Sequence, residues 1–132
     1  MTALPVAQAQ DPLSSARAQL RTVLYTSDLE PGTALATTHR HLRQMVNCLE
    51  GPQGRNFTAG AGYPCRRQGS GILVDLRAVA DTGHAKAGKA FRYSQAAHVF
   101  ALQGLRSGDA DEARTYAWMA AFDIGNALEA LE

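Results

Sequence analysis

The chain has 132 residues, a length typical of one domain, and its 45% hydrophobic and 19% charged residues exclude a disordered or collagen-like polymer. A net charge of +1 argues against a nucleic-acid partner, because binding to a phosphate backbone favours a strongly basic protein. No stretch approaches the roughly 20 apolar residues needed to cross a bilayer, so no membrane span is expected.

Residues 1–10 are expected to be a leader, and residues 11–132 a single folded domain. Ala7-Gln8-Ala9 matches the small-x-small pattern after which signal peptidase cleaves, although the charged and apolar regions that should precede it are missing. We therefore expect Met1 to be an added start residue on the remnant of a signal peptide, and the protein to be periplasmic or secreted. The alternative is a chance match in an alanine-rich terminus.

The first two predicted helices precede Gly51. Asp11-Pro12 is a typical helix start, and a helical spacing of apolar residues follows it to an end near residues 27–30. A second helix is predicted from about Thr33 to Gly51-Pro52. Its apolar seam steps alternately by three and four residues, which suits packing against a neighbouring helix: Leu35, Thr38, Leu42, Met45 and Leu49.

A long loop and a third helix are predicted next. Residues 51–71 hold six of the twelve glycines and two of the five prolines, a composition that does not sustain a helix. Ser70 is expected to cap a third helix, which continues with a kink at residues 81–83 to about Leu105. Its second half carries a seam that includes His84 and His98.

The fourth helix begins at Asp109, because Glu112 three residues later forms the pattern of a capping box. Its predicted seam is rich in small residues: Ala113, Ala117, Ala120, Ile124, Ala127 and Leu131. Small side chains allow helices to approach closely. The sequence therefore predicts an all-α fold, an antiparallel four-helix bundle with a long Gly/Pro-rich loop between helices two and three.

The two cysteines, Cys48 and Cys65, predict a disulfide, because an even count in a small exported chain is typical of a cross-link. Such a bond stabilises a loop of this size by about 3 kcal/mol. If the thiols were free, Cys65 beside Arg66 and Arg67 would be a candidate nucleophile of a thiol enzyme.

A metal or haem site is predicted from residues near the end of helix two. His41, Met45 and Cys48 share one helical stripe, and His98 would reach it from helix three. Imidazole and thioether ligands suit copper or non-covalent haem, so His41, Met45 and His98 are the candidate ligands. The alternative is that these side chains belong to the core, where histidine finds a hydrogen bond and methionine fills gaps.

An anion site is predicted where the loop meets helix three. Arg55, Arg66 and Arg67 lie in the loop, and free amides after Ser70 would attract a carboxylate, sulfate or phosphate. The alternative is that the arginines are solvated surface residues.

Trp118 and Phe122 lie four residues apart on helix four, off its alanine seam. Two large aromatics in this position indicate either an interface with a partner or a second copy, or coverage by loops. Charge is also uneven, since residues 40–92 hold nine basic and three acidic residues and residues 107–132 hold one and six. Such asymmetry indicates helices of opposite charge lying side by side or, less often, a binding surface.

The segment from His41-Leu42 through Asn47 to Glu50-Gly51, with its Gly/Pro-rich loop, resembles a group of small exported bacterial helical proteins. The resemblance covers about residues 41–76 and directs attention to His41, Asn47 and Glu50. Taken together, these observations predict a non-enzymatic extracytoplasmic bundle that binds a small ligand, metal or haem near the end of helix two. The competing hypotheses are an interaction module or oligomer that uses Trp118 and Phe122 and, third, an enzyme with a Cys65 nucleophile.

Overall fold

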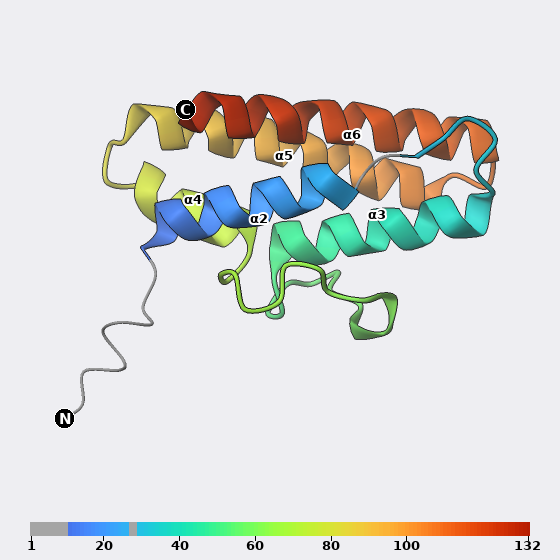
Figure 1. Cartoon of the computed structure of the whole chain (residues 1–132), viewed down its shortest axis with the longest axis horizontal. Coiled ribbons are helices and arrows are strands. Elements are labelled where there is room, and N and C mark those ends of the chain that lie inside the picture. The colour runs from blue at the N-terminus through green and yellow to red at the C-terminus, as the bar shows by residue number, and fades with distance from the viewer. Residues whose placement is uncertain (1–10, 27–28) are drawn as a thin grey trace.

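The structure is a computed structural model that describes residues 11–26 and 29–132, and all regular structure within them is helical. The predicted leader, residues 1–10, lies outside this part. The described residues form five α-helices and one turn of 3-10 helix: α2 (Pro12–Thr26), α3 (Leu35–Glu50), η1 (Ala59–Ala61), α4 (Ile72–Ala80), α5 (Ala85–Arg106) and α6 (Ala110–Leu131). Figure 1 shows α2, α3, α5 and α6 running in alternating directions, with α5 and α6 most extensively paired. The prediction of an all-helical protein is confirmed.

Two of the predicted helix starts are built by aspartate. The Asp11 carboxylate accepts hydrogen bonds from the Ser14 amide at 2.8 Å and the Ser14 hydroxyl at 2.9 Å, so it caps α2. Asp109 accepts the Glu112 amide at 2.8 Å and caps α6 in the same way. The Glu112 carboxylate does not reach back to close a capping box, because it accepts the Ser107 hydroxyl at 2.6 Å instead.

The third predicted helix is two helices rather than one with a kink. α4 ends at Ala80, and α5 starts after a turn in which His84 Nδ1 accepts the Ala87 amide at 3.2 Å. His84 is therefore a cap and not a member of the seam. The predicted Ser70 cap is also wrong, because the N-cap of α4 is Gly71, which has no side chain. The short α4 packs against both α2 and α5.

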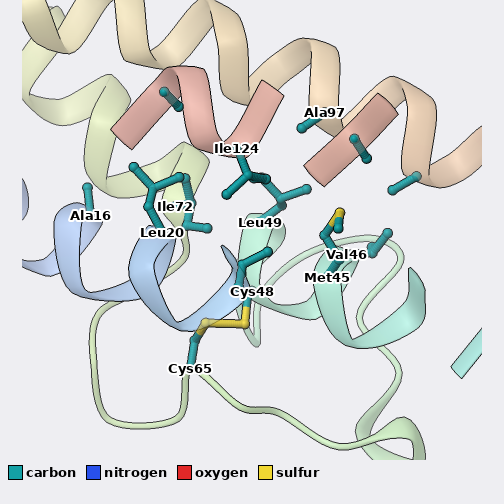
Figure 2. Packing of buried hydrophobic residues seen from close by; sticks show 14 of the residues in the cluster. Ala16, Leu20, Met45, Val46, Cys48, Leu49, Cys65, Ile72, Ala97 and Ile124 are labelled. Atoms are coloured by element: carbon teal, nitrogen blue, oxygen red, sulfur yellow. A yellow bond between two sulfur atoms is a disulfide. The ribbon is translucent and has the colours of Figure 1, made fainter. Parts of the chain in front are cut away.

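Alanines and a few large aliphatic residues fill the core (Figure 2). Every member of the predicted α6 seam is buried, and Ala90, Ala97 and Ala101 of α5 are fully buried as well. With side chains this small, the backbones of neighbouring helices approach closely and pack without large voids. The larger side chains at the centre are Leu20, Leu42, Leu49, Ile72, Leu76 and Ile124.

Residues 51–71 leave α3 and return to almost the same point before α4 begins. Gly51 has a φ of +79° and Gly71 a φ of +127°, a region that favours glycine. A Cβ on Gly51 would lie 1.9 Å from the Ser70 carbonyl oxygen, and one on Gly71 would lie 2.6 Å from that of Glu50. The backbone at the start of the loop therefore lies directly against the backbone at its end, and only glycine fits at these two positions. We call this contact between Gly51 and Gly71 the neck of the loop.

None of the helices in the described ranges combines the length and the hydropathy needed to cross a bilayer.

Candidate ligand-binding site

The loop between α3 and α4 is attached to α3 by side chains of that helix. The fully buried Asn47 donates from Nδ2 to the carbonyl oxygens of Thr58 and Gly62, both at 2.8 Å, and accepts the Thr58 amide at 2.8 Å. One helical turn earlier, Gln44 donates to the Ala61 carbonyl at 2.9 Å. These bonds supply the backbone partners that regular secondary structure would otherwise provide.

The disulfide adds a covalent attachment at the other side of the loop. Cys48 of α3 and Cys65 are bonded, with their Cα atoms 5.5 Å apart, and both are fully buried at the edge of the core (Figure 2). The predicted cross-link is present. Because no cysteine in the described part of the chain is free, Cys65 lacks the thiol that the enzyme hypothesis requires.

Glu50, the last residue of α3, joins the loop to α5. Its Oε1 accepts the Asn56 amide at 2.7 Å, and its Oε2 accepts the Asn56 side-chain amide at 2.7 Å and lies 2.5 Å from Nε2 of His98. Burial alone would raise the pKa of the Glu50 carboxyl. The hydrogen bonds from Asn56 and the contact with His98 outweigh this effect and hold the pKa below its usual value.

A hollow of about 500 Å³ opens beside Asn56, where α3, the loop and the end of α5 meet. Eight residues line it: Arg43, Arg55, Asn56, Phe57, Thr58, Leu102, Leu105 and Arg106. We call it the arginine hollow. None of the lining residues is acidic, and the three arginines form no ion pair within residues 11–26 and 29–132. In the wall formed by the loop, Phe57 packs edge-on against Tyr63 with ring centroids 5.2 Å apart, and this contact helps to fix its position.

The predicted metal ligands have separate partners. His98 contacts Glu50, Met45 is only 5% exposed in the core, and His41 Nδ1 lies 3.2 Å from the Thr26 carbonyl oxygen. His41 precedes Glu50 by nine residues, about 13 Å along the helix axis, so the structure does not bring the two histidines together. Among the residues described, no three His, Cys, Asp or Glu side chains converge on a point that could hold an ion. Copper or haem binding remains a prediction.

The predicted anion-binding residues are divided between two places. Arg55 lines the arginine hollow, whereas Arg67 and Ser70 line a second hollow of about 420 Å³ next to Asp75. There the Asp75 carboxylate accepts the Ser70 amide at 3.0 Å, so the start of α4 already has an anion of its own. Arg66 is exposed and lines neither hollow.

Sequence reasoning missed Arg43, Asn56 and Arg106. Arg43 is an ordinary exposed residue of its helix, and Arg106 is a basic residue in the last turn of another helix, where the helix dipole alone would explain it. Only the path of the loop brings these side chains to one hollow. The segment from Asn47 to Glu50 gave a partial signal, since both residues hold the loop that carries Asn56.

The predicted interface residues are exposed. Trp118 is 43% and Phe122 70% exposed, and together with Phe100 and Met119 they line an apolar hollow of about 410 Å³ over α5 and α6. Among the described residues, Leu29 of the segment between α2 and α3 contacts one edge of Trp118, and both aromatic side chains remain largely exposed.

No model of a known protein family matches the chain, and no curated protein or solved structure is significantly similar to it. The site must therefore be interpreted from its own chemistry.

Proposed function

We propose that this protein is a non-enzymatic, extracytoplasmic small-ligand-binding protein that takes an amphipathic carboxylate in the arginine hollow. The observation that carries the proposal is the set of three arginines, Arg43, Arg55 and Arg106, around one hollow whose lining contains no acidic residue; the nearby Glu50 carboxylate is occupied by Asn56 and His98. Cations grouped in this way repel one another, and a bound anion relieves that repulsion. Guanidinium groups also hold carboxylates by paired hydrogen bonds.

The remaining lining residues favour a ligand with an apolar part. Leu102 and Leu105 of α5 and Phe57 of the loop are half-buried and present hydrocarbon to the hollow. A volume of about 500 Å³ lies within the range of small-molecule pockets. An inorganic anion would leave this surface wet, whereas the chain of a short fatty acid would cover it and gain about 25 cal/mol per Å² of apolar area.

The fold supports the site through the loop. Glu50 holds Asn56 by two hydrogen bonds, and the disulfide and Asn47 hold the remainder of the loop, so its wall of the hollow is organised before a ligand arrives. The disulfide also supports the extracytoplasmic assignment, because such bonds persist in oxidising compartments. We infer that the scaffold is a four-helix bundle of α2, α3, α5 and α6, to which α4 is added, on the basis of their alternating directions (Figure 1).

The proposal is tested by titrating octanoate into the protein at low salt and measuring the heat of binding. We expect saturable binding at one site, weakened at least about tenfold by Arg43→Gln or Arg106→Gln, because each removes a charged hydrogen-bond donor. Arg40→Gln is the matched control. Arg40 is an exposed arginine on the same helix but does not line the hollow, so its loss should leave the affinity unchanged.

Two further probes test separately the roles of the carboxylate and of the apolar chain. Methyl octanoate has the same chain without the charge and should bind much more weakly than octanoate. Acetate has the charge without the chain and should also bind more weakly than octanoate. If Arg40→Gln weakens octanoate binding as much as Arg43→Gln does, attraction is diffuse and the hollow is not the site. If octanoate does not bind, the proposed ligand class is wrong.

A further inference from the structure

The exposed face of α6 is a second surface, independent of the arginine hollow. Trp118, Met119 and Phe122 are 43%, 38% and 70% exposed and lie within about one turn of one another. Phe100 of α5 completes the hollow beneath them. Large aromatics exposed as a group are uncommon on monomers and are typical of the anchor positions of protein interfaces.

The tryptophan is held in place. Its indole Nε1 donates to the Leu29 carbonyl oxygen at 3.1 Å, and Leu29 itself is 7% exposed. The ring is therefore fixed by a hydrogen bond at one edge while much of its surface remains open to solvent. A rigid aromatic loses little conformational entropy when a partner covers it.

Acidic residues flank the aromatic group on the same helical face. Glu112 lies six residues before Trp118, Glu129 lies seven residues after Phe122, and Asp123 lies beside the hollow. The separations of Glu112 from Trp118 and of Glu129 from Phe122 correspond to about 9 and about 10.5 Å along the helix. None of the three carboxylates forms an ion pair in the described part of the chain.

No basic residue in the described part of the chain forms an ion pair with Glu112, Asp123 or Glu129. Arg114 is 8% exposed and is engaged by Asp111 and by the Thr33 carbonyl oxygen. Lys89 and Arg92 of α5 line a separate hollow with Tyr93 and form no ion pair within the described residues. At the end of α6, Arg17 and Arg21 pair with Glu132, and Lys86 donates to the main-chain oxygen of that residue. The face is thus apolar at its centre, with a carboxylate that forms no ion pair among the described residues toward each end, Glu112 and Glu129.

We propose that this face binds a basic amphipathic helix of a partner protein. An apolar stripe on that helix would cover Trp118, Met119 and Phe122, and lysines or arginines one to two turns to either side would meet Glu112 and Glu129. Charge argues against a second copy of this chain, because two α6 helices crossed at their aromatic centres would bring like acidic ends together.

The test uses Trp118 itself, which is the only tryptophan in the chain and therefore reports on this face alone. The probe is a synthetic helical peptide of about 18 residues with a central leucine stripe and lysines near both ends. We expect the tryptophan emission to shift to shorter wavelength as the peptide covers the ring, and the binding to weaken as salt is raised. Phe122→Ser should weaken binding at least about tenfold, because it removes the most exposed anchor.

Matched variants separate the apolar and the electrostatic components of peptide binding. Val74→Ser removes an apolar residue that is 49% exposed on α4 and should leave peptide binding unchanged. The Glu112→Gln, Glu129→Gln double variant should bind the peptide several-fold more weakly and should lose most of the salt dependence. Far-UV circular dichroism checks that each variant keeps its helices.

Three outcomes would overturn the proposal. The first is an unchanged emission spectrum at saturating peptide. The second is equal binding of a control peptide in which glutamate replaces lysine, which would make the charge argument wrong. The third is an emission shift that depends on protein concentration without peptide, with a matching increase in sedimentation-derived mass, which would identify a second copy as the occupant. Because octanoate binding is measured separately, this proposal and the proposed function fail independently.

Discussion

The loop of residues 51–71 and helix α6 are stabilised in contrasting ways. α6 is held by many small apolar contacts along its seam, each contributing little, and its backbone satisfies its own hydrogen bonds. The loop has one turn of regular structure and depends on a disulfide and on the polar side chains of Gln44, Asn47 and Glu50. The contrast indicates that removing one side chain from α6 takes away only a small part of what holds that helix, whereas removing one attachment can release the loop.

The largest effect is expected from the disulfide. In the Cys48→Ala, Cys65→Ala double variant, the free energy of unfolding should fall by about 3 kcal/mol, because the unfolded chain regains the entropy of an open loop. Urea denaturation measures the loss. Hydrogen exchange should show that loop amides such as that of Thr58 lose protection before those of α6. Uniform loss of protection across both regions would mean that the loop and α6 are stabilised in the same way.

A smaller effect is expected from Asn47→Ala. The change removes the side-chain partner of the Thr58 amide and of the Gly62 carbonyl oxygen, whereas the Thr58 carbonyl oxygen keeps the Ala61 amide at 3.1 Å. Because these groups are partly buried, we expect a loss of about 2 kcal/mol in the free energy of unfolding. Asn126→Ala on α6 is the control. Asn126 is half-buried, and its side chain bonds Asp123 of the same helix rather than the loop, so its replacement should cost less than that of Asn47, about 0.5 to 1 kcal/mol. Similar losses in the two variants would mean that Asn47 has no special role.

The smallest effect concerns pH and Glu50. Because folding lowers the pKa of Glu50, its carboxylate adds stability that is fully present above the unfolded pKa and is lost as pH falls through the folded value. Burial raises the pKa of Asp75 and of Asp123, and these groups act in the opposite direction. The pH dependence of wild-type stability therefore combines the contributions of Glu50, Asp75 and Asp123.

Comparison with Glu50→Gln isolates the Glu50 contribution, since both proteins retain the two aspartates. The variant should melt at a lower temperature near neutral pH, and the difference between the two melting temperatures should narrow from about pH 6 to about pH 3. A difference in melting temperature that stays constant across this pH range would show that the ionised form of Glu50 is not specifically stabilised in the folded protein.

The parts of the fold that the sequence predicts correctly are those encoded locally. The α6 seam and the caps formed by Asp11 and Asp109 follow from helical spacing and from short-range hydrogen bonds. The break between α4 and α5 does not follow from local sequence, because residues 81–83 are compatible both with a bend in one helix and with the end of a helix. The packing of α4 on α2 distinguishes the two, and it is a tertiary contact. The number of helices was therefore wrong, although the helical class was right.

The candidate site was harder to predict than the fold. His98 on α5 has a polar partner, as expected for a histidine on the seam, but the partner is Glu50 and not His41. Residues 48 positions apart can be paired only once the helix ends are placed in space. Arg106 and Arg55 are likewise neighbours through tertiary structure alone.

Because of the neck formed by Gly51 and Gly71, the positions of α3 and α4 do not depend on the length of the loop between them. Because the chain leaves α3 and enters α4 at nearly the same point, residues can be added to or removed from the intervening segment without displacing either helix. The wall of the arginine hollow that this segment supplies can therefore change its size and chemistry, as long as Cys65, which is buried in the core, and its bond to Cys48 are kept. In protein engineering, the same geometry makes the loop a natural place to exchange one binding segment for another.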